Sequence, residues 1–111
     1  MRREDLYLAD IVESADDIGR FLSGRDFSNF IGDEILRAAI LQKLIVIGEA
    51  VGRLSTDFKK THRGVEWVDI VAFRNFAIHA YFAVDWAIVW TAATKNVPVL
   101  KAYIKEITPE S

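Results

Sequence analysis

The stretch DEILRAAILQKLIVIGEAVGRLS, residues 33–55, decides the fold class of this chain. Its apolar residues recur at intervals of four, four, three, four and three: Leu36, Ile40, Leu44, Ile47, Val51 and Leu54. That spacing is the period of an α-helix, although the run LIVI inside it would also suit a strand. Because the helical period continues on both sides of LIVI, we predict one helix over about 33–55. Leu41, Ile45 and Val46 are apolar as well, so this helix is expected at the centre of the fold or at an oligomer interface.

The residues before this segment predict another helix, over about 4–22. Its apolar positions are spaced by three and four residues: Leu6, Ala9, Val12, Ala15, Ile18 and Leu22. The pair Ser23-Gly24 follows directly, and glycine is a common residue just past the end of a helix. We therefore expect this helix to end near Leu22.

Two more helices are predicted after the long one. Residues 56–64, TDFKKTHRG, are polar and are expected to form a connector. A third helix is predicted over about 65–79, and a fourth over about 86–107 with Asp85 as its N-cap. Pro98 should kink the fourth helix or break it in two, because proline has no amide hydrogen to donate. No segment alternates like a half-buried strand, so we predict an all-α fold, a compact bundle of four to five helices.

Length and composition fit one small domain over residues 1–111. The chain has 111 residues, of which 51% are hydrophobic, and no cysteine. A core of this size is modest, so surplus apolar surface would be buried best by self-association. The sequence shows neither a signal peptide nor the roughly 18 uncharged apolar residues of a membrane span. A cytoplasmic protein with no membrane association is expected.

The sequence offers little for metal or cofactor binding. Without cysteine and with only His62 and His79, a structural zinc site is not expected. The glycines are scattered and form no phosphate loop. The stretch GEAVG, residues 48–52, lies inside the long predicted helix, where small residues more often permit close packing than bind phosphate. We expect no metal and no cofactor.

Basic residues concentrate in the middle of a chain whose net charge is −2. Residues 37–74 carry seven basic and four acidic side chains, whereas the first 36 residues carry four basic and nine acidic ones. The candidate RNA-binding residues in this middle part are Arg53, Lys59, Lys60 and Arg63, together with Arg74. The alternative is that they are solvated helix ends and a loop, without a binding role.

The stretch RNFAIHAY, residues 74–81, carries the clearest chemical signal. Histidine both takes and gives a proton near neutral pH, so His79 could serve as general acid or base. Arginine holds phosphate and neutralises charge that grows in a phosphoryl transition state, which is the role expected for Arg74. Together they could cleave RNA with the substrate's own 2′-hydroxyl as nucleophile, a reaction that needs no metal.

Helix geometry complicates this interpretation. Arg74 and His79 are five residues apart, which places them about 140° apart around a straight helix. Either the helix ends at His79, so that Ala80 and Tyr81 can turn, or a second copy of the motif completes the site across a two-fold axis. An Arg and a His at this spacing are weak evidence by themselves. His79 could instead cap helix carbonyls, and Tyr81 could be a core residue.

The context of the motif strengthens it. Four features, IGEAVGRL (47–54), Trp67, RNFAIHAY (74–81) and VDWAIVW (84–90), occur in an order that resembles the HepT-like branch of the HEPN superfamily. The resemblance covers most of the chain, from about Leu6 to Leu100.

The family's Arg-x-x-x-x-His-x-Tyr signature falls on Arg74, His79 and Tyr81, and the polar residue that usually follows the arginine is Asn75. The resemblance implies a helical homodimer that acts as a metal-independent endoribonuclease toxin, with Arg74, Asn75 and His79 as catalytic residues. It also implies a partner, a minimal nucleotidyltransferase antitoxin of the MntA type, which silences the toxin by adding AMP to Tyr81. The added bulk and negative charge beside Arg74 would repel an RNA phosphate.

Two other functions are compatible with the sequence. One is a non-catalytic HEPN module that binds a nucleotidyltransferase or presents substrate to it. The other is a structural helical dimer in which the motif is a packing relic. Growth arrest on expression of the chain alone would favour the toxin. The sequence does not indicate which RNA is cut.

Overall fold

The computed structural model describes residues 2–108 of the chain. Within them the backbone is helical, with no strand, so the predicted all-α fold is confirmed. The elements follow in the order α1 (Arg2–Leu22), α2 (Phe27–Ile31), α3 (Glu34–Arg53), α4 (Thr56–Thr61), α5 (Trp67–His79), η1 (Tyr81–Ala83), α6 (Trp86–Thr91), η2 (Ala92–Asn96) and α7 (Val97–Ile107). No helix in residues 2–108 is long and apolar enough to pass through a bilayer.

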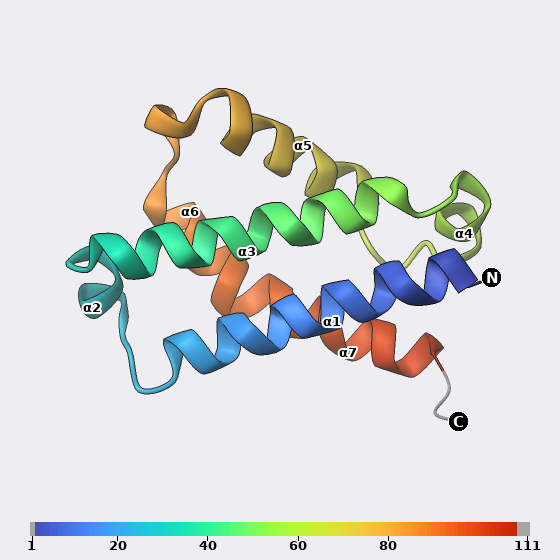
Figure 1. Cartoon of the computed structure of the whole chain (residues 1–111), viewed down its shortest axis with the longest axis horizontal. Coiled ribbons are helices and arrows are strands. Elements are labelled where there is room, and N and C mark those ends of the chain that lie inside the picture. The colour runs from blue at the N-terminus through green and yellow to red at the C-terminus, as the bar shows by residue number, and fades with distance from the viewer. Residues whose placement is uncertain (1, 109–111) are drawn as a thin grey trace.

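Helix α3 is the centre of the bundle, as its apolar sequence predicts. It crosses the middle of the molecule with α1 on one side and α5 on the other, and α7 lies next to α1 (Figure 1). The whole predicted stripe is buried: Leu36, Ile40, Leu44, Ile47, Val51 and Leu54. Leu41, on another side of the helix, is buried too. Each such side chain contributes about 1.5–3 kcal/mol when fully buried, so α3 supplies much of the core.

The buried face of α1 differs from the predicted one in its first half. The buried residues are Leu8, Ile11, Ala15, Ile18 and Leu22, whereas Leu6 and Ala9 are exposed. The predicted stripe advanced by repeated steps of three residues, and each such step falls about 60° short of a full turn. The buried set alternates steps of three and four, which keeps it on one side of the helix.

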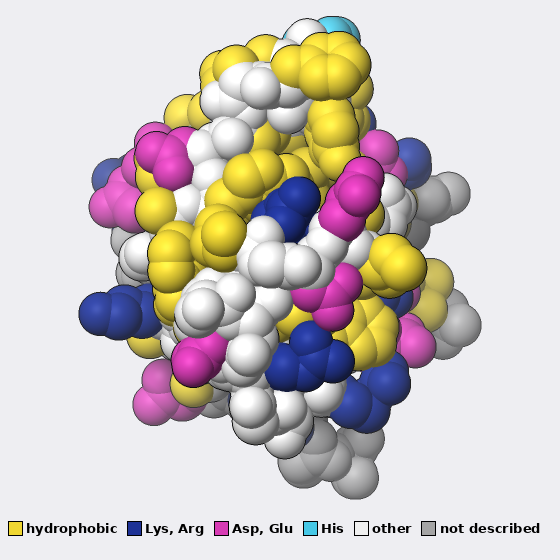
Figure 2. Space-filling model, turned by 90° about the vertical axis from the view of Figure 1, so that its left-hand side faces the viewer, with side chains coloured by type: hydrophobic (Ala, Val, Ile, Leu, Met, Phe, Trp, Pro, Cys, Tyr) yellow, Lys and Arg dark blue, Asp and Glu magenta, His cyan; other side chains and the backbone are white. Residues whose placement is uncertain are grey.

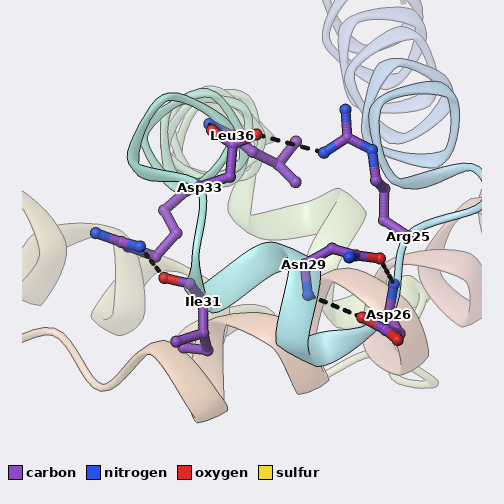
Figure 3. Close-up of polar contacts among 7 residues, drawn as sticks. Arg25, Asp26, Asn29, Ile31, Asp33 and Leu36 are labelled. Atoms are coloured by element: carbon purple, nitrogen blue, oxygen red, sulfur yellow. Dashed lines mark hydrogen bonds and ion pairs between the residues drawn. The ribbon is translucent and has the colours of Figure 1, made fainter.

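A short helix that the sequence did not predict, α2, closes one end of the bundle. Its N-terminus is a capping box, in which Asp26 accepts a hydrogen bond from the Asn29 amide at 2.8 Å and the Asn29 side chain accepts one from the Asp26 amide at 2.9 Å (Figure 3). Phe30 is fully buried, and its ring centroid lies 5.3 Å from that of Trp90 in α6. Phe30 also contacts Trp86, and Phe27 contacts Trp90, so aromatic contacts with α6 anchor α2. The sequence did not reveal this helix because one buried residue in five gives no detectable period.

The α2–α3 junction fixes where the central helix begins. Asp33 caps α3 by accepting a hydrogen bond from the Leu36 amide at 3.0 Å, and Arg25 pairs with Asp33 at 3.4 Å (Figure 3). The Leu36 amide, together with Arg25, lowers the pKa of the Asp33 carboxyl below its usual value. Arg37 donates to the Ile31 carbonyl across the same junction. The prediction that α3 begins near residue 33 is therefore confirmed.

The predicted connector over residues 56–64 is wrong in its first part, which forms α4. Ser55 caps this helix by accepting a hydrogen bond from the Phe58 amide at 3.0 Å. Phe58 also holds the helix against the bundle, because its ring lies 6.0 Å from that of Trp67. The indole of Trp67 donates to the His62 carbonyl at 2.6 Å, which fixes the loop before α5.

The C-terminal segment is divided, as Pro98 predicts. Asp85 caps α6 by accepting from the Ala87 amide at 2.9 Å, so the predicted N-cap is confirmed. The helix then passes through a π-helical segment, η2, before α7 begins with Pro98 in its first turn. Proline has no amide hydrogen for the carbonyl four residues earlier, so the regular hydrogen-bond ladder is interrupted just before it.

Candidate active site on α5

Helix α5 lies against α3 through a glycine. A Cβ atom added to Gly48 would meet the Cβ of Arg74 at 2.3 Å and its Cγ at 2.8 Å. Only glycine permits this approach, so the expected packing role of GEAVG is confirmed at Gly48. At Gly52 an added Cβ would come no closer than 3.9 Å to Val71, an ordinary contact that does not require glycine.

Arg74 is held in place by partners on both helices. Its Nη1 donates to the Asn75 side chain at 2.7 Å, and its Nη2 donates to the Glu49 carboxylate of α3 at 3.1 Å. Its Nε is buried and lacks a hydrogen-bond partner. The side chain of Arg74 keeps 31% of its surface exposed. The guanidinium is thus oriented, and part of it remains open to a phosphate.

His79 stands at the other end of the motif with its ring open to solvent. It is the last residue of α5, since Ala80 leaves the helical conformation with φ −133 and ψ 47. Among residues 2–108, no side-chain hydrogen bond or ion pair involves the His79 ring. The alternative that His79 caps helix carbonyls is not what the structure shows. The His79 side chain is therefore exposed and accessible from solvent.

The structure does not bring Arg74 and His79 together within one chain. Both lie on the same regular helix, so they remain about 140° apart and about 7.5 Å apart along its axis. The helix does end at His79, one of the two expected solutions. The end of the helix lets the chain change direction after His79. It does not alter the position of Arg74 relative to His79. The other expected solution, a second copy of the motif, stays a prediction.

Tyr81 lies just beyond α5, in the 3₁₀ turn η1. It is exposed, and its ring lies edge-on to that of Phe82 with centroids 5.9 Å apart. The alternative that Tyr81 is a core residue is therefore wrong. Its side chain is thus accessible from solvent.

The four candidate RNA-binding residues lie away from His79. Arg53 ends α3, Lys59 and Lys60 occupy the last turn of α4, and the Nε of Arg63 donates to the Lys60 carbonyl at 3.2 Å. Helix α4 lies at the end of the molecule where α5 begins, opposite to η1 (Figure 1). These basic side chains do not surround His79.

An apolar groove that the sequence did not predict runs beside α5. It has a volume of about 690 Å³ and separates α5 from α6 and α7. Ile70 and Phe73 of α5, Leu44 of α3 and Ile88 of α6 are among its lining residues. The groove leaves α5 packed mainly along α3 within the described part of the chain. Residues 2–108 hold no cluster of three or more His, Cys, Asp or Glu side chains that could bind a metal ion.

The fold and the motif together define an all-α, HEPN-like protein, with an Arg–Asn pair and a terminal histidine on one short helix. Comparison with known families agrees. The family described as “Ribonuclease HepT-like” matches residues 11–107, and the chain belongs to this family. The expected family is thereby confirmed, and the expected enzyme class, an endoribonuclease, is supported.

Similar proteins occur in several organisms. A protein of Thermococcus cleftensis named “Probable ribonuclease HepT” is 33% identical over 91% of this chain and 92% of its own length. Two proteins named “Putative RNase” are also similar. One, from Methanocaldococcus jannaschii, is 34% identical over 89% of this chain and 91% of its own length. The other, from Caldanaerobacter subterraneus subsp. tengcongensis, is 35% identical over 91% of this chain and 90% of its own length. The comparison with solved structures gives no match.

Proposed function

We propose that this protein is a metal-independent endoribonuclease in which Arg74 and His79 act on the scissile phosphate. The observation that carries the proposal is the oriented, partly open guanidinium of Arg74 on the same short helix as the exposed His79. His79 takes the proton of the 2′-hydroxyl or gives one to the leaving 5′-oxygen. Arg74, oriented by Asn75, neutralises the charge on the phosphate as the 2′-oxygen attacks. The products are a 2′,3′-cyclic phosphate and a 5′-hydroxyl end.

The site is proposed to be composite, formed by two copies of the chain around a two-fold axis. The support is an apolar surface around the C-terminal end of α5 and the turn that follows it, where the exposed residues are Phe76, Ile78, Tyr81 and Phe82. Figure 2 looks onto this end of the molecule, and hydrophobic side chains gather over its upper part with a histidine at the top. A concentration of exposed apolar side chains is typical of an interface. Pairing across it would bring two histidines to one cleft.

The mechanism is tested by incubating the purified protein with total RNA in excess chelator. Cleavage is expected to continue, because neither proposed catalytic group needs a metal. The product ends should be 2′,3′-cyclic phosphates, or the 3′-phosphates that form from them. Loss of cleavage in chelator, restored by added magnesium, would contradict the mechanism. An inactive wild-type protein would favour a non-catalytic HEPN module that presents substrate to a nucleotidyltransferase.

We further propose that the protein is the toxin of a pair whose antitoxin is an MntA-like nucleotidyltransferase, and that AMP is added to Tyr81. The support is the exposed position of the Tyr81 phenol, two residues beyond His79. Tyr81→Phe removes the acceptor hydroxyl and keeps the ring, so the variant should fold normally and retain much of its cleavage activity. It should still arrest growth when the nucleotidyltransferase is co-expressed, whereas the wild type should be silenced.

Mass spectrometry of the co-expressed proteins measures this directly. The wild type should carry AMP on the peptide that contains Tyr81, and the variant should carry none there. The matched control is Tyr103→Phe, since Tyr103 is half-buried against Trp67 at the far end of α5. Silencing that persists in Tyr81→Phe, with AMP found on another residue, would refute the assignment.

A further inference from the structure

The guanidinium of Arg74 is held from a second helix, by a residue that the motif does not include. Glu49 of α3 accepts a hydrogen bond from Nη2 at 3.1 Å, while Asn75 of α5 accepts one from Nη1 at 2.7 Å. An arginine has five N–H groups, and these two bonds use one hydrogen on each terminal nitrogen. A second hydrogen remains on each of Nη1 and Nη2. Each terminal nitrogen can therefore still donate to a phosphate while both protein contacts persist.

The sequence of α3 explains why Glu49 reaches this position. Gly48 has no side chain, so the stem of Arg74 lies directly on the α3 backbone at this point. Glu49 is the next residue, and its carboxylate meets the guanidinium where the arginine stem leaves the helix surface. The Gly48-Glu49 pair therefore fixes both the stem and the head of Arg74.

The ion pair between Arg74 and Glu49 is partly exposed to solvent, and this exposure bears on its role. The side chain of Arg74 is 31% exposed and that of Glu49 is 45% exposed. Ion pairs this open to solvent add little to folding stability, since water screens them and the side chains lose freedom. A carboxylate beside a phosphate-binding arginine also repels the RNA backbone. The pair therefore weakens substrate binding and does little for folding, so its benefit lies in orienting the guanidinium.

We propose that Glu49 is a positioning residue for Arg74, one that orients the guanidinium toward the reacting phosphate at the expense of ground-state RNA binding. The inference rests on the proposed ribonuclease function. An oriented donor acts mainly on the transition state, whereas the negative charge of Glu49 opposes substrate and transition state alike. Loss of Glu49 should therefore lower kcat and KM together. Loss of a merely structural residue would not lower KM while it lowers kcat.

Two substitutions separate the hydrogen bond from the charge. Glu49→Ala removes both, so kcat should fall on the order of 10-fold, and KM should fall about 2- to 3-fold. Glu49→Gln keeps an acceptor oxygen at the same reach but not the charge. It should recover most of kcat while KM stays as low as in Glu49→Ala. The matched control is Glu13→Gln, the same change at an exposed position of α1, which should leave both parameters unchanged.

The measurement is the steady-state cleavage of a fluorescent oligoribonucleotide, with thermal melting of each variant as the folding control. Glu49→Ala with the kcat of the wild type would overturn the positioning role alone. The positioning role would also be overturned if Glu49→Gln were as slow as Glu49→Ala and both variants lost the acidic limb of the pH–rate profile. That result would show that Glu49 acts as a base. A wild-type protein that does not cleave RNA would overturn the proposed function as well, and that result is visible before any variant is compared.

Discussion

His79→Ala is expected to cleave RNA about 100-fold more slowly than the wild type, or slower still. The ring of His79 is exposed at the end of α5 and makes no side-chain hydrogen bond within residues 2–108. Its removal should therefore leave the melting temperature unchanged while it removes the proton-transfer group. The measurement is the single-turnover rate on a defined oligoribonucleotide, with circular dichroism as the folding control.

The second histidine of the chain provides the contrasting control. His62 lies 4.3 Å from the Phe58 ring, centroid to centroid, and its Nδ1 is 3.1 Å from the Phe58 carbonyl. His62→Ala should therefore lower the melting temperature and leave the chemical step in place. A full rate in His79→Ala, or an equal loss of rate in the two variants, would show that His79 has no special part in the chemistry.

Mixing two inactive variants tests whether the site is shared between copies. In a mixed dimer, the His79→Ala chain still supplies Arg74 and the Arg74→Ala chain still supplies His79. One of the two composite sites is then intact. Random exchange makes half of the dimers mixed, so about a quarter of the wild-type activity should return. If each chain built its site alone, the mixture would stay inactive.

Gly48→Ala is expected to lower both stability and activity, although alanine normally favours a helix. The gain in helix propensity is about 1 kcal/mol. The new methyl group would stand 2.3 Å from the Arg74 Cβ, which is fixed to the α5 backbone, so α5 must move away from α3. Overpacking of this kind costs about 1–3 kcal/mol, and a shift of about 1 Å at a catalytic group can lower a rate about 100-fold.

Gly52→Ala is the matched control for this prediction, on the same helix one turn later. Its added Cβ would lie 3.9 Å from Val71, so the propensity gain should appear without a clash. Urea unfolding should place Gly48→Ala about 1–3 kcal/mol below Gly52→Ala in the free energy of unfolding. Equal stabilities, with normal RNA cleavage in both, would show that α5 does not depend on the close contact at Gly48.

Long periodic segments of this fold were predictable, and short ones were not. The stripe of α3 from Leu36 to Leu54 repeats often enough to fix both the helix and its buried face. Helix α2 has one buried residue, Phe30, whose partners lie some 60 residues further along the chain in α6. Helix α4 depends on Phe58 in the same way. A period needs several turns, so short elements anchored by one or two aromatic side chains leave no pattern in the sequence.

In the candidate site, too, the local sequence motif was predictable and the contact between distant residues was not. Arg74, Asn75, His79 and Tyr81 stand together in one motif, and a helix that ends at His79 was one of the two solutions that their spacing left open. The Glu49 contact joins residues 25 positions apart, and nothing in either helix pattern pairs them. The available signal was the glycine before Glu49. A glycine inside a helix can indicate that another segment packs closely against it. The residue next to the glycine is then in a position to contact that segment.

The groove beside α5 also sets how this helix behaves over time. Because α5 packs mainly along α3, it can detach without the unfolding of α1 and α3. Its amide hydrogens should therefore exchange with solvent through a local opening that costs less free energy than the opening of the core. Anything that binds only the attached state, RNA or a second copy, makes that opening rarer. A ligand present at 100 times its Kd adds about 2.7 kcal/mol to the free energy of opening. The amides of α5 would then exchange about 100-fold more slowly, and their protection would measure occupancy of the site without any cleavage taking place.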